Sequence, residues 1–147
     1  MTRINSAINV KLLIDEHLKS EHREIIRMVS FYHRTIGEGK KVNISSKFTL
    51  NTEHMKFFVN KQRFLYKRYL QIYLECINRG INVQLYASNW DSIDLNKSED
   101  YSPTDEERLL LIERITERIK HGKSPEYHYY GKKISKEQAI NLLYESK

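Results

Sequence analysis

The amino terminus of this chain carries the first group that could do chemistry. Met1 is followed by a small residue, so we expect its removal and a mature chain that begins at Thr2. A free α-amine has a pKa of about 7.7–8.0, so much of it is neutral and nucleophilic near neutral pH, whereas a lysine amine is almost wholly protonated. Thr2 is therefore a candidate amine nucleophile, with the cation Arg3 beside it.

A second set of candidate residues is the pair Arg23-Glu24 together with Arg27. On a helix, Arg23 and Arg27 lie one turn apart on one face, and Glu24 is offset by about 100°. Such a face is ordinarily solvated and held by weak ion pairs. The alternative is a lone carboxylate among cations, in which the arginines hold phosphates and Glu24 stabilises a cationic intermediate. Spacing alone leaves both interpretations open.

Composition favours a helical protein that binds an anion. The chain has 147 residues, which is typical of one domain, and we expect 1–147 to form a single compact unit. Charged residues make up 30% and hydrophobic residues 39%, with five glycines and two prolines, a balance that indicates an all-α fold. The net charge of +6 indicates a polyanionic partner, of which nucleic acid is the most common.

Other features of the sequence indicate the cellular compartment and exclude several kinds of binding site. Cys76 is the single cysteine, and its place in an apolar helical run predicts a buried structural thiol and no intramolecular disulfide. No apolar run approaches the ~20 residues that cross a bilayer, and no secretory signal is apparent. No spacing typical of metal ligands or of a phosphate-binding glycine loop occurs. We therefore expect a monomeric, intracellular, cytoplasmic protein without membrane contact, metal or cofactor.

Hydrophobic periodicity predicts three main helices. The first covers 15–36 and the second 62–79, each followed by a glycine that can end a helix. The third follows Ser102-Pro103-Thr104 and runs to Gly122. It could begin at Ser102 with Pro103 in the first helical position, or at Thr104 with Glu107 in a capping box.

A short fourth helix is expected over 136–144, with Ser135 as its N-cap and Gln138 three residues later. Two stretches of about twenty residues, 39–61 and 81–101, have no strong periodicity and predict long irregular loops. Loops of this length in a compact domain are usually functional or held by a bound partner.

Several motifs, in order along the chain, resemble the pyrimidine-dimer DNA glycosylase and abasic-site lyase family of the T-even phage endonuclease V type. They are Met1-Thr2-Arg3-Ile4-Asn5, His17-Leu18, Glu21-His22-Arg23-Glu24 with Arg27, His54-Met55-Lys56-Phe57-Phe58, Phe64-Leu65 with Lys67-Arg68, Glu75-Cys76 with Arg79-Gly80, Arg114-Ile115 with Arg118-Ile119, and Tyr127-His128-Tyr129-Tyr130-Gly131-Lys132. The resemblance covers all but the last fourteen or so residues, so that 134–147 is a C-terminal extension outside it.

The resemblance implies a defined reaction on ultraviolet-damaged duplex DNA. The Thr2 α-amine attacks C1′ of the 5′ nucleotide of a cyclobutane pyrimidine dimer, and the glycosidic bond breaks. A Schiff base forms, and β-elimination then cuts the strand at the abasic site. Glu24 is the implied catalytic carboxylate, which stabilises the cationic iminium and helps to move protons. No metal or cofactor takes part.

The resemblance also implies a DNA-binding surface. Its phosphate contacts are Arg3, Arg23, Arg27, Arg114, Arg118 and Lys132, and its further contacts are Glu16, His22, Tyr127, His128 and Tyr129. In the family the duplex is kinked and a nucleotide opposite the lesion is flipped out. The aromatic run 127–130 has two interpretations that can both hold: rings that fill a small core between helix ends, and rings that face DNA. His17 is expected to position other groups.

Three departures from the family pattern leave the substrate range open. Glu16 stands where the family has glutamine, His22 replaces a tyrosine, and Glu126 stands in place of a tryptophan. One alternative is therefore an abasic lyase or a glycosylase for another lesion, such as a ring-opened purine. A second alternative is a non-catalytic, basic helical protein that binds nucleic acid.

Overall fold

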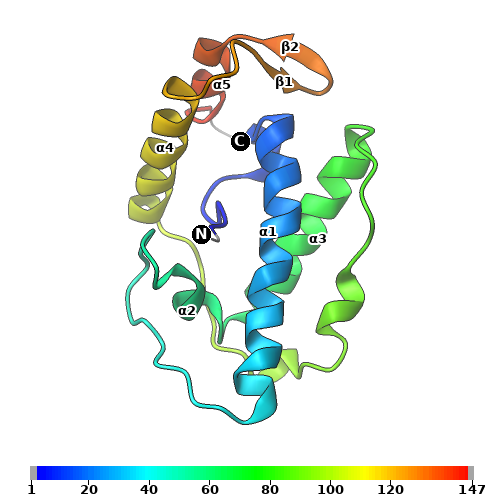
Figure 1. Ribbon diagram of the computed structural model, residues 1–147, viewed down its shortest axis with the longest axis vertical. Coiled ribbons are helices and arrows are strands. Elements are labelled where there is room, and N and C mark those ends of the chain that lie inside the picture. The colour runs from blue at the N-terminus through cyan, green and yellow to red at the C-terminus, as the bar shows by residue number, and fades with distance from the viewer. Residues whose placement is uncertain (1–2, 146–147) are drawn as a thin grey trace.

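The computed structural model describes residues 3–145 and is mostly helical. Its long helices are α1 (Asp15–Arg34), α3 (Gln62–Asn78) and α4 (Asp105–Lys120). The short elements are α2 (His54–Phe58), α5 (Lys136–Leu142), the strands β1 (Tyr127–Tyr129) and β2 (Lys132–Ile134), and four 3-10 turns, η1 (Val10–Leu12), η2 (Ile36–Glu38), η3 (Ala87–Trp90) and η4 (Leu95–Lys97). Helices α1 and α3 run side by side. The N-terminal segment, residues 3–14, lies between α1 and α4 (Figure 1). The predicted all-α class is confirmed, with one small hairpin added.

The core joins the apolar faces of the three long helices to the apolar side chains of the N-terminal segment that lies between α1 and α4 (Figure 1). Its fully buried members on the helices include Leu18, Ile25 and Val29 of α1, Leu65, Tyr69, Ile72 and Cys76 of α3, and Leu111, Ile115 and Ile119 of α4. These are the residues whose spacing predicted each helix. Burial raises the pKa of the Cys76 thiol to about 11, so it is protonated at neutral pH, as expected for a structural cysteine.

The helix ends follow local capping rules more closely than hydrophobic periodicity. Helix α1 ends at Arg34, two residues before the predicted end, because Thr35 leaves the helical conformation. Of the two starts considered for α4, the structure has the capping box of Thr104 with Glu107. The predicted capping box of Ser135 with Gln138 is also present and begins α5.

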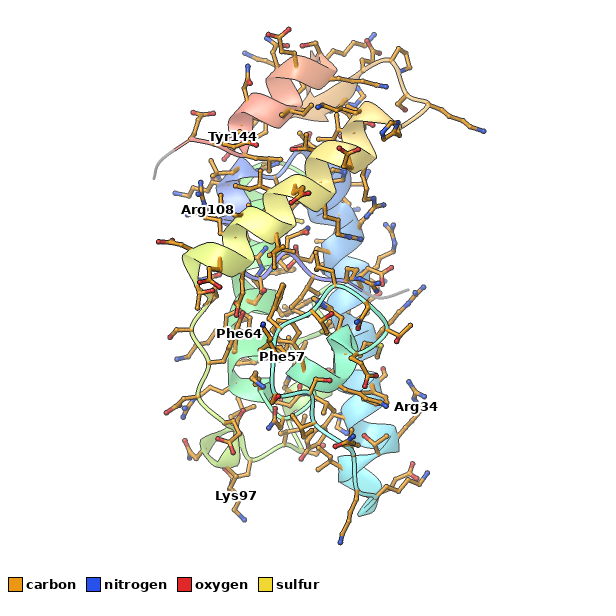
Figure 2. All side chains as sticks on the ribbon, turned by 90° about the vertical axis from the view of Figure 1, so that its left-hand side faces the viewer. Arg34, Phe57, Phe64, Lys97, Arg108 and Tyr144 are labelled. Atoms are coloured by element: carbon orange, nitrogen blue, oxygen red, sulfur yellow. The ribbon has the colours of Figure 1, made fainter. Side chains whose placement is uncertain are left out.

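The two aperiodic stretches contain structure that the sequence did not predict. The 39–61 stretch includes α2, whose Phe57 and Phe58 pack edge-on against Phe48 and Tyr101. Figure 2 shows this region, with Phe57 and Phe64 labelled beneath the end of α4. The 81–101 stretch carries η3 and η4 and buries Trp90. These aromatic side chains attach both stretches to the core, so the predicted loops are partly ordered turns.

The C-terminal part of the chain folds onto α4. Strand β1 pairs antiparallel with β2, and the turn between them has positive φ at Tyr130 and Gly131, as a type I′ hairpin requires. Helix α5 buries Ala139 against the rest of the protein, and Leu143, which directly follows the helix, is buried as well. Most of the extension outside the family resemblance is therefore packed structure. Within the described residues, no helix is long and apolar enough to span a membrane.

A buried ion pair holds the N-terminal segment against α1 and α3. Arg68 Nε lies 2.7 Å from Glu21 Oε2, and the two side chains are 4% and 1% exposed. Each partner also binds the segment's backbone: Asn5 N donates to Glu21 Oε1 at 3.1 Å, and Arg68 Nη1 donates to the oxygen of Ile8 at 2.6 Å. The pair therefore makes the N-terminal segment part of the core.

His54 holds the same segment one residue closer to the terminus. Its Nε2 accepts a hydrogen bond from Ile4 N at 3.1 Å, and its Nδ1 lies 2.7 Å from the oxygen of Thr49. Only the neutral ring with its proton on Nδ1 can make both bonds. Burial, with a smaller effect of Arg3, lowers the pKa of His54 to about 4 and favours this neutral form.

Removing one partner of the ion pair should strongly destabilise the fold. We expect Glu21→Ala to lower the free energy of unfolding by about 3–5 kcal/mol, because it leaves Arg68 buried without its counter-charge. Chemical denaturation measures this change. The control is Glu53→Ala, which breaks the exposed pair of Glu53 with Lys56 and should cost less than about 1 kcal/mol. Equal effects of the two variants would contradict the importance of the buried pair.

Acid should weaken the fold through His54. Its folded pKa of about 4 lies below the ordinary value of 6.5, so the unfolded chain takes up the proton first. The stabilisation is fully present above pH 6.5 and is lost as the pH falls towards 4. Denaturation curves across this range should show a smaller loss for His54→Gln than for the unmodified protein. His121→Gln, at an exposed position, should keep the original profile, and identical profiles for all three proteins would contradict the assignment.

Candidate active site

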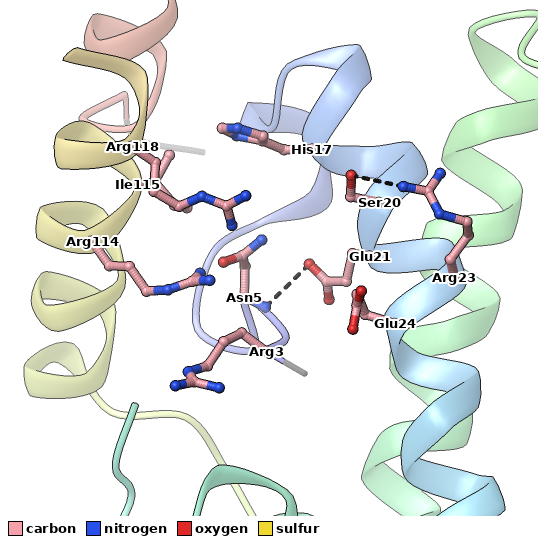
Figure 3. Close-up of a pocket in the computed structure, with 10 residues that line it drawn as sticks. All are labelled: Arg3, Asn5, His17, Ser20, Glu21, Arg23, Glu24, Arg114, Ile115 and Arg118. Atoms are coloured by element: carbon pink, nitrogen blue, oxygen red, sulfur yellow. Dashed lines mark hydrogen bonds between the residues drawn. The ribbon is translucent and has the colours of Figure 1, made fainter. Parts of the chain in front are cut away.

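The N-terminal segment, α1 and α4 enclose a polar cavity of about 250 Å³ (Figure 3). Its lining residues come from all three elements and are Arg3, Asn5, His17, Ser20, Glu21, Arg23, Glu24, Arg114, Ile115 and Arg118. Ile115 is apolar, and the other lining residues carry charged or polar side chains. The cavity therefore suits a charged, hydrogen-bonding ligand better than an apolar ring.

Glu24 and the α1 arginines lie as the helical spacing predicted. The Glu24 side chain is 25% exposed and its Oε2 lies 3.5 Å from Arg27 Nη1, while Arg27 itself is largely in solvent. Arg23 Nη2 donates a hydrogen bond to Ser20 Oγ at 3.3 Å (Figure 3). The weak ion pair is therefore present, and Glu24 shares the cavity with a second carboxylate, that of Glu21.

Helix α4 brings two more cations to the cavity from a distant part of the chain. Arg114 and Arg118, one turn apart, point from α4 towards the N-terminal segment (Figure 3). Burial and the nearby charges of Arg118 and Arg3 lower the pKa of Arg114 to about 10. Like charges held this close repel one another, so an anion bound between them would relieve that repulsion.

His17 lines the same cavity as a neutral ring. Burial, followed by the charge of Arg118, lowers its pKa to about 4, so it carries no charge at neutral pH. Its ring lies 6.4 Å from that of Tyr127, centre to centre. His17 thus sits between the cavity and the hairpin, and the positioning role expected for it stays a prediction.

The proposed nucleophile itself, Thr2, lies outside the described residues. Arg3, the residue that follows it, lines the cavity, and the backbones of Ile4 and Asn5 are fixed by hydrogen bonds to His54 and Glu21. The described chain therefore leads into the cavity that Glu24 also lines.

The hairpin of β1 and β2, which contains the aromatic run, lies beyond the cavity at the N-terminal end of α1 (Figure 1). Glu16 attaches this hairpin to α1. Glu16 Oε1 accepts from His128 N at 3.0 Å, and its Oε2 lies 2.7 Å from His128 Nδ1. Tyr127 is buried, and the Tyr129 hydroxyl donates to the oxygen of Lys11 at 2.6 Å. Tyr127 therefore fills the core, as one interpretation of the aromatic run predicts. Lys132, at the start of β2, is exposed to solvent.

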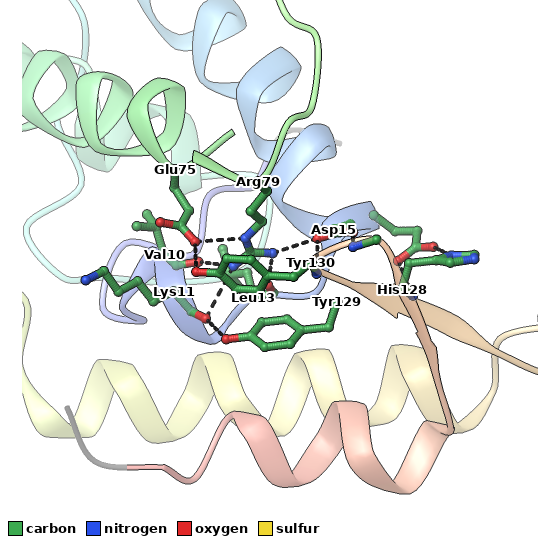
Figure 4. Close-up of polar contacts among 11 residues, drawn as sticks. Val10, Lys11, Leu13, Asp15, Glu75, Arg79, His128, Tyr129 and Tyr130 are labelled. Atoms are coloured by element: carbon green, nitrogen blue, oxygen red, sulfur yellow. Dashed lines mark hydrogen bonds and ion pairs between the residues drawn. The ribbon is translucent and has the colours of Figure 1, made fainter. Parts of the chain in front are cut away.

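Arg79, to which sequence reasoning gave no role, organises this hairpin (Figure 4). Its side chain is fully buried and pairs with Glu75 Oε2 at 2.8 Å and Asp15 Oδ1 at 2.9 Å. The rings of Tyr129 and Tyr130 stack within 4.8 and 4.5 Å of its guanidinium carbon. The spacing of four residues between Glu75 and Arg79 was a visible signal of a helical ion pair, but not of its burial.

His22, predicted as a DNA contact, occupies a different environment. It is 3% exposed, and its Nε2 lies 3.0 Å from both the Tyr69 hydroxyl oxygen and the oxygen of Gln84. Burial lowers its pKa. These bonds join α1, α3 and the segment after α3, so the structure gives His22 a scaffold role and does not support a direct DNA contact through its ring.

Comparison with known proteins assigns a family to this arrangement. A family model described as pyrimidine dimer DNA glycosylase matches residues 1–89. The match takes in α1, with Glu24, and the described part of the N-terminal segment, and it covers more than half of the chain. The protein therefore belongs to the pyrimidine dimer DNA glycosylase family, and it acts on DNA that contains pyrimidine dimers.

Proposed function

We propose that this glycosylase is also an abasic-site lyase, with the Thr2 α-amine as nucleophile and Glu24 as catalytic carboxylate. The observation that carries the proposal is the convergence of the fixed N-terminal segment and Glu24 on one polar cavity, with Arg114 and Arg118 opposite. A terminal amine can attack carbon at neutral pH without the large pKa shift that a lysine would need.

The reaction proceeds in two stages on the 5′ nucleotide of the dimer. The amine forms a bond to C1′ and the base departs. The C1′–O4′ bond then opens to give a protonated imine, in which Glu24 stabilises the positive charge. Loss of a C2′ proton and departure of the 3′ phosphate complete the strand cut by β-elimination.

The arginines around the cavity hold the DNA backbone. We assign phosphate contacts to Arg3, Arg23, Arg27, Arg114, Arg118 and Lys132. Arg114 is the best-supported of these, because it lines the cavity together with Arg3 and Arg118, whose nearby charges add to burial in lowering its pKa. A dimer stacks poorly, so bending the duplex at the lesion costs less than elsewhere. His128 and Tyr129 would border the duplex beyond α1, and Glu16 would act through its bonds to His128. The protein works as a monomer.

A second cavity, of about 520 Å³, is a candidate receptor for the flipped-out nucleotide opposite the lesion. It lies between α1 and the segment after α3, and Arg23, Val83 and Tyr86 are among its lining residues. Arg23 lines both cavities, so one duplex can reach both. The lining of this second cavity is more apolar than that of the first, so it suits a base better.

Borohydride trapping tests the covalent chemistry. The purified protein, shown by intact mass to lack Met1, is mixed with duplex DNA carrying an abasic site and reduced with borohydride. We expect a covalent protein–DNA adduct, and none with protein whose α-amine has been acetylated. No adduct with the unmodified protein would favour a non-catalytic DNA-binding protein. Nicking of ultraviolet-irradiated plasmid separates a dimer glycosylase from a lyase or a glycosylase for ring-opened purines, which would leave dimers uncut.

Replacing the Glu24 carboxylate should separate binding from catalysis. We expect Glu24→Gln to lower the single-turnover rate on dimer-containing DNA by about 100-fold or more, because it removes the charge that stabilises the imine. Affinity for the same DNA should be unchanged or slightly tighter. Glu113→Gln makes the same change at an exposed position on α4 and should act like the unmodified protein. Near-normal cleavage by Glu24→Gln would show that the carboxylate is misassigned.

A further inference from the structure

Asn5 is a lining residue of the first cavity to which the proposed mechanism gives no role. Its side chain is 8% exposed, and its Oδ1 is fully buried with no hydrogen-bond partner among residues 3–145. A buried carbonyl oxygen in a folded protein nearly always has a partner, so an orphan beside a cavity calls for a donor that the described protein does not supply. The carboxamide lies between the α4 arginines and Glu21 (Figure 3).

The backbone of Asn5 is fixed, so its carboxamide has little freedom to find a partner elsewhere. Its N–H donates to Glu21 Oε1, and Glu21 is itself held by Arg68. The preceding residue, Ile4, is held by His54. An unpaired acceptor at a rigid position costs the free protein stability, and the cost is recovered when a ligand supplies a donor.

The donor that the reaction supplies is a hydroxyl group on the sugar. In the intact nucleotide O4′ is a ring ether and has no proton to donate. After the amine has attacked C1′, the nitrogen lone pair forms the C1′=N bond and the C1′–O4′ pair leaves on O4′. O4′ then takes up the proton that the attacking amine has lost and becomes a 4′-hydroxyl. The cavity is polar and small enough that a sugar and its phosphate, rather than a base, fit it best.

We propose that Asn5 is a catalytic residue whose side-chain carbonyl accepts a hydrogen bond from the 4′-hydroxyl of the ring-opened sugar. The bond exists in the Schiff-base intermediate and not in the bound substrate. It therefore favours ring opening without strengthening substrate binding, which is how an interaction raises a rate. The inference rests on the proposed amine chemistry of Thr2.

The test compares Asn5 variants on two substrates with the full chain lacking Met1. On duplex DNA with a natural abasic site, Asn5→Ala and Asn5→Leu should lower the single-turnover rate of borohydride trapping about tenfold. Affinity for duplex DNA with a tetrahydrofuran abasic analogue, which cannot open, should stay within about twofold. Asn5→Asp keeps an acceptor oxygen and should retain a rate within about threefold of the original. Asn96→Ala, at an exposed asparagine in η4, should change neither quantity.

The second substrate separates a contact with the sugar from a structural role. It is an acyclic aldehyde analogue of the abasic site that lacks the 4′-hydroxyl, and on it Asn5→Ala should react as fast as the unmodified protein. A tenfold defect that persists on this analogue, or a parallel loss of tetrahydrofuran-DNA affinity, would overturn the proposal. A full rate for Asn5→Ala on the natural site would overturn it as well. Absence of any adduct with the unmodified protein would instead refute the amine chemistry itself. If Asn5→Ala does not fold, Asn5→Asp still tests the proposal. A low trapping rate of Asn5→Asp together with normal affinity for tetrahydrofuran DNA would overturn the proposal.

Discussion

The buried pair of Glu21 and Arg68 is the interaction on which the rest of this structure depends. Taking two charges out of water is costly, and such a pair is tolerated where its remaining hydrogen-bonding capacity is used. Here that capacity is used on the backbone of Asn5 and Ile8. Chain termini ordinarily fray, and the proposed use of the Thr2 α-amine as nucleophile would need a chain that is positioned close to its start. The ion pair builds the described part of the N-terminal segment into the core.

The cavity next to this pair is arranged for binding rather than for stability. Burial, followed by the nearby charges of Arg118 and Arg3, lowers the pKa of Arg114 to about 10, so its charged form is held there at a cost. The unpaired Oδ1 of Asn5 is a second cost at the same place. Groups held in unfavourable environments are characteristic of functional sites, because the ligand supplies what the free protein lacks. In the proposed mechanism, a sugar with its phosphate supplies a partner to both groups.

Most of the regular structure could be predicted from the sequence, because each long helix carries its own signals. Periodicity located α1, α3 and α4, and the capping boxes at Thr104 and Ser135 located the starts of α4 and α5. Helix α2 was missed because its five residues span little more than one turn, too few to show a period. The hairpin was missed because three-residue strands give almost no alternation, and its turn places a tyrosine at positive φ.

The sequence by itself determined the kinds of chemistry available to this protein. The small residue after Met1, the carboxylate of Glu24 between two arginines, and the order of the family motifs are all local properties of the chain. Only the tertiary structure decided how deeply each side chain is buried and which residues it pairs with. Glu21 and Glu24 lie three residues apart on α1, yet Glu21 is buried in an ion pair while Glu24 faces the cavity and solvent. His22, between them, became a buried scaffold group. Burial and charge pairing arise from residues far apart in the sequence, such as Arg68 and Arg114, and local spacing does not encode those contacts.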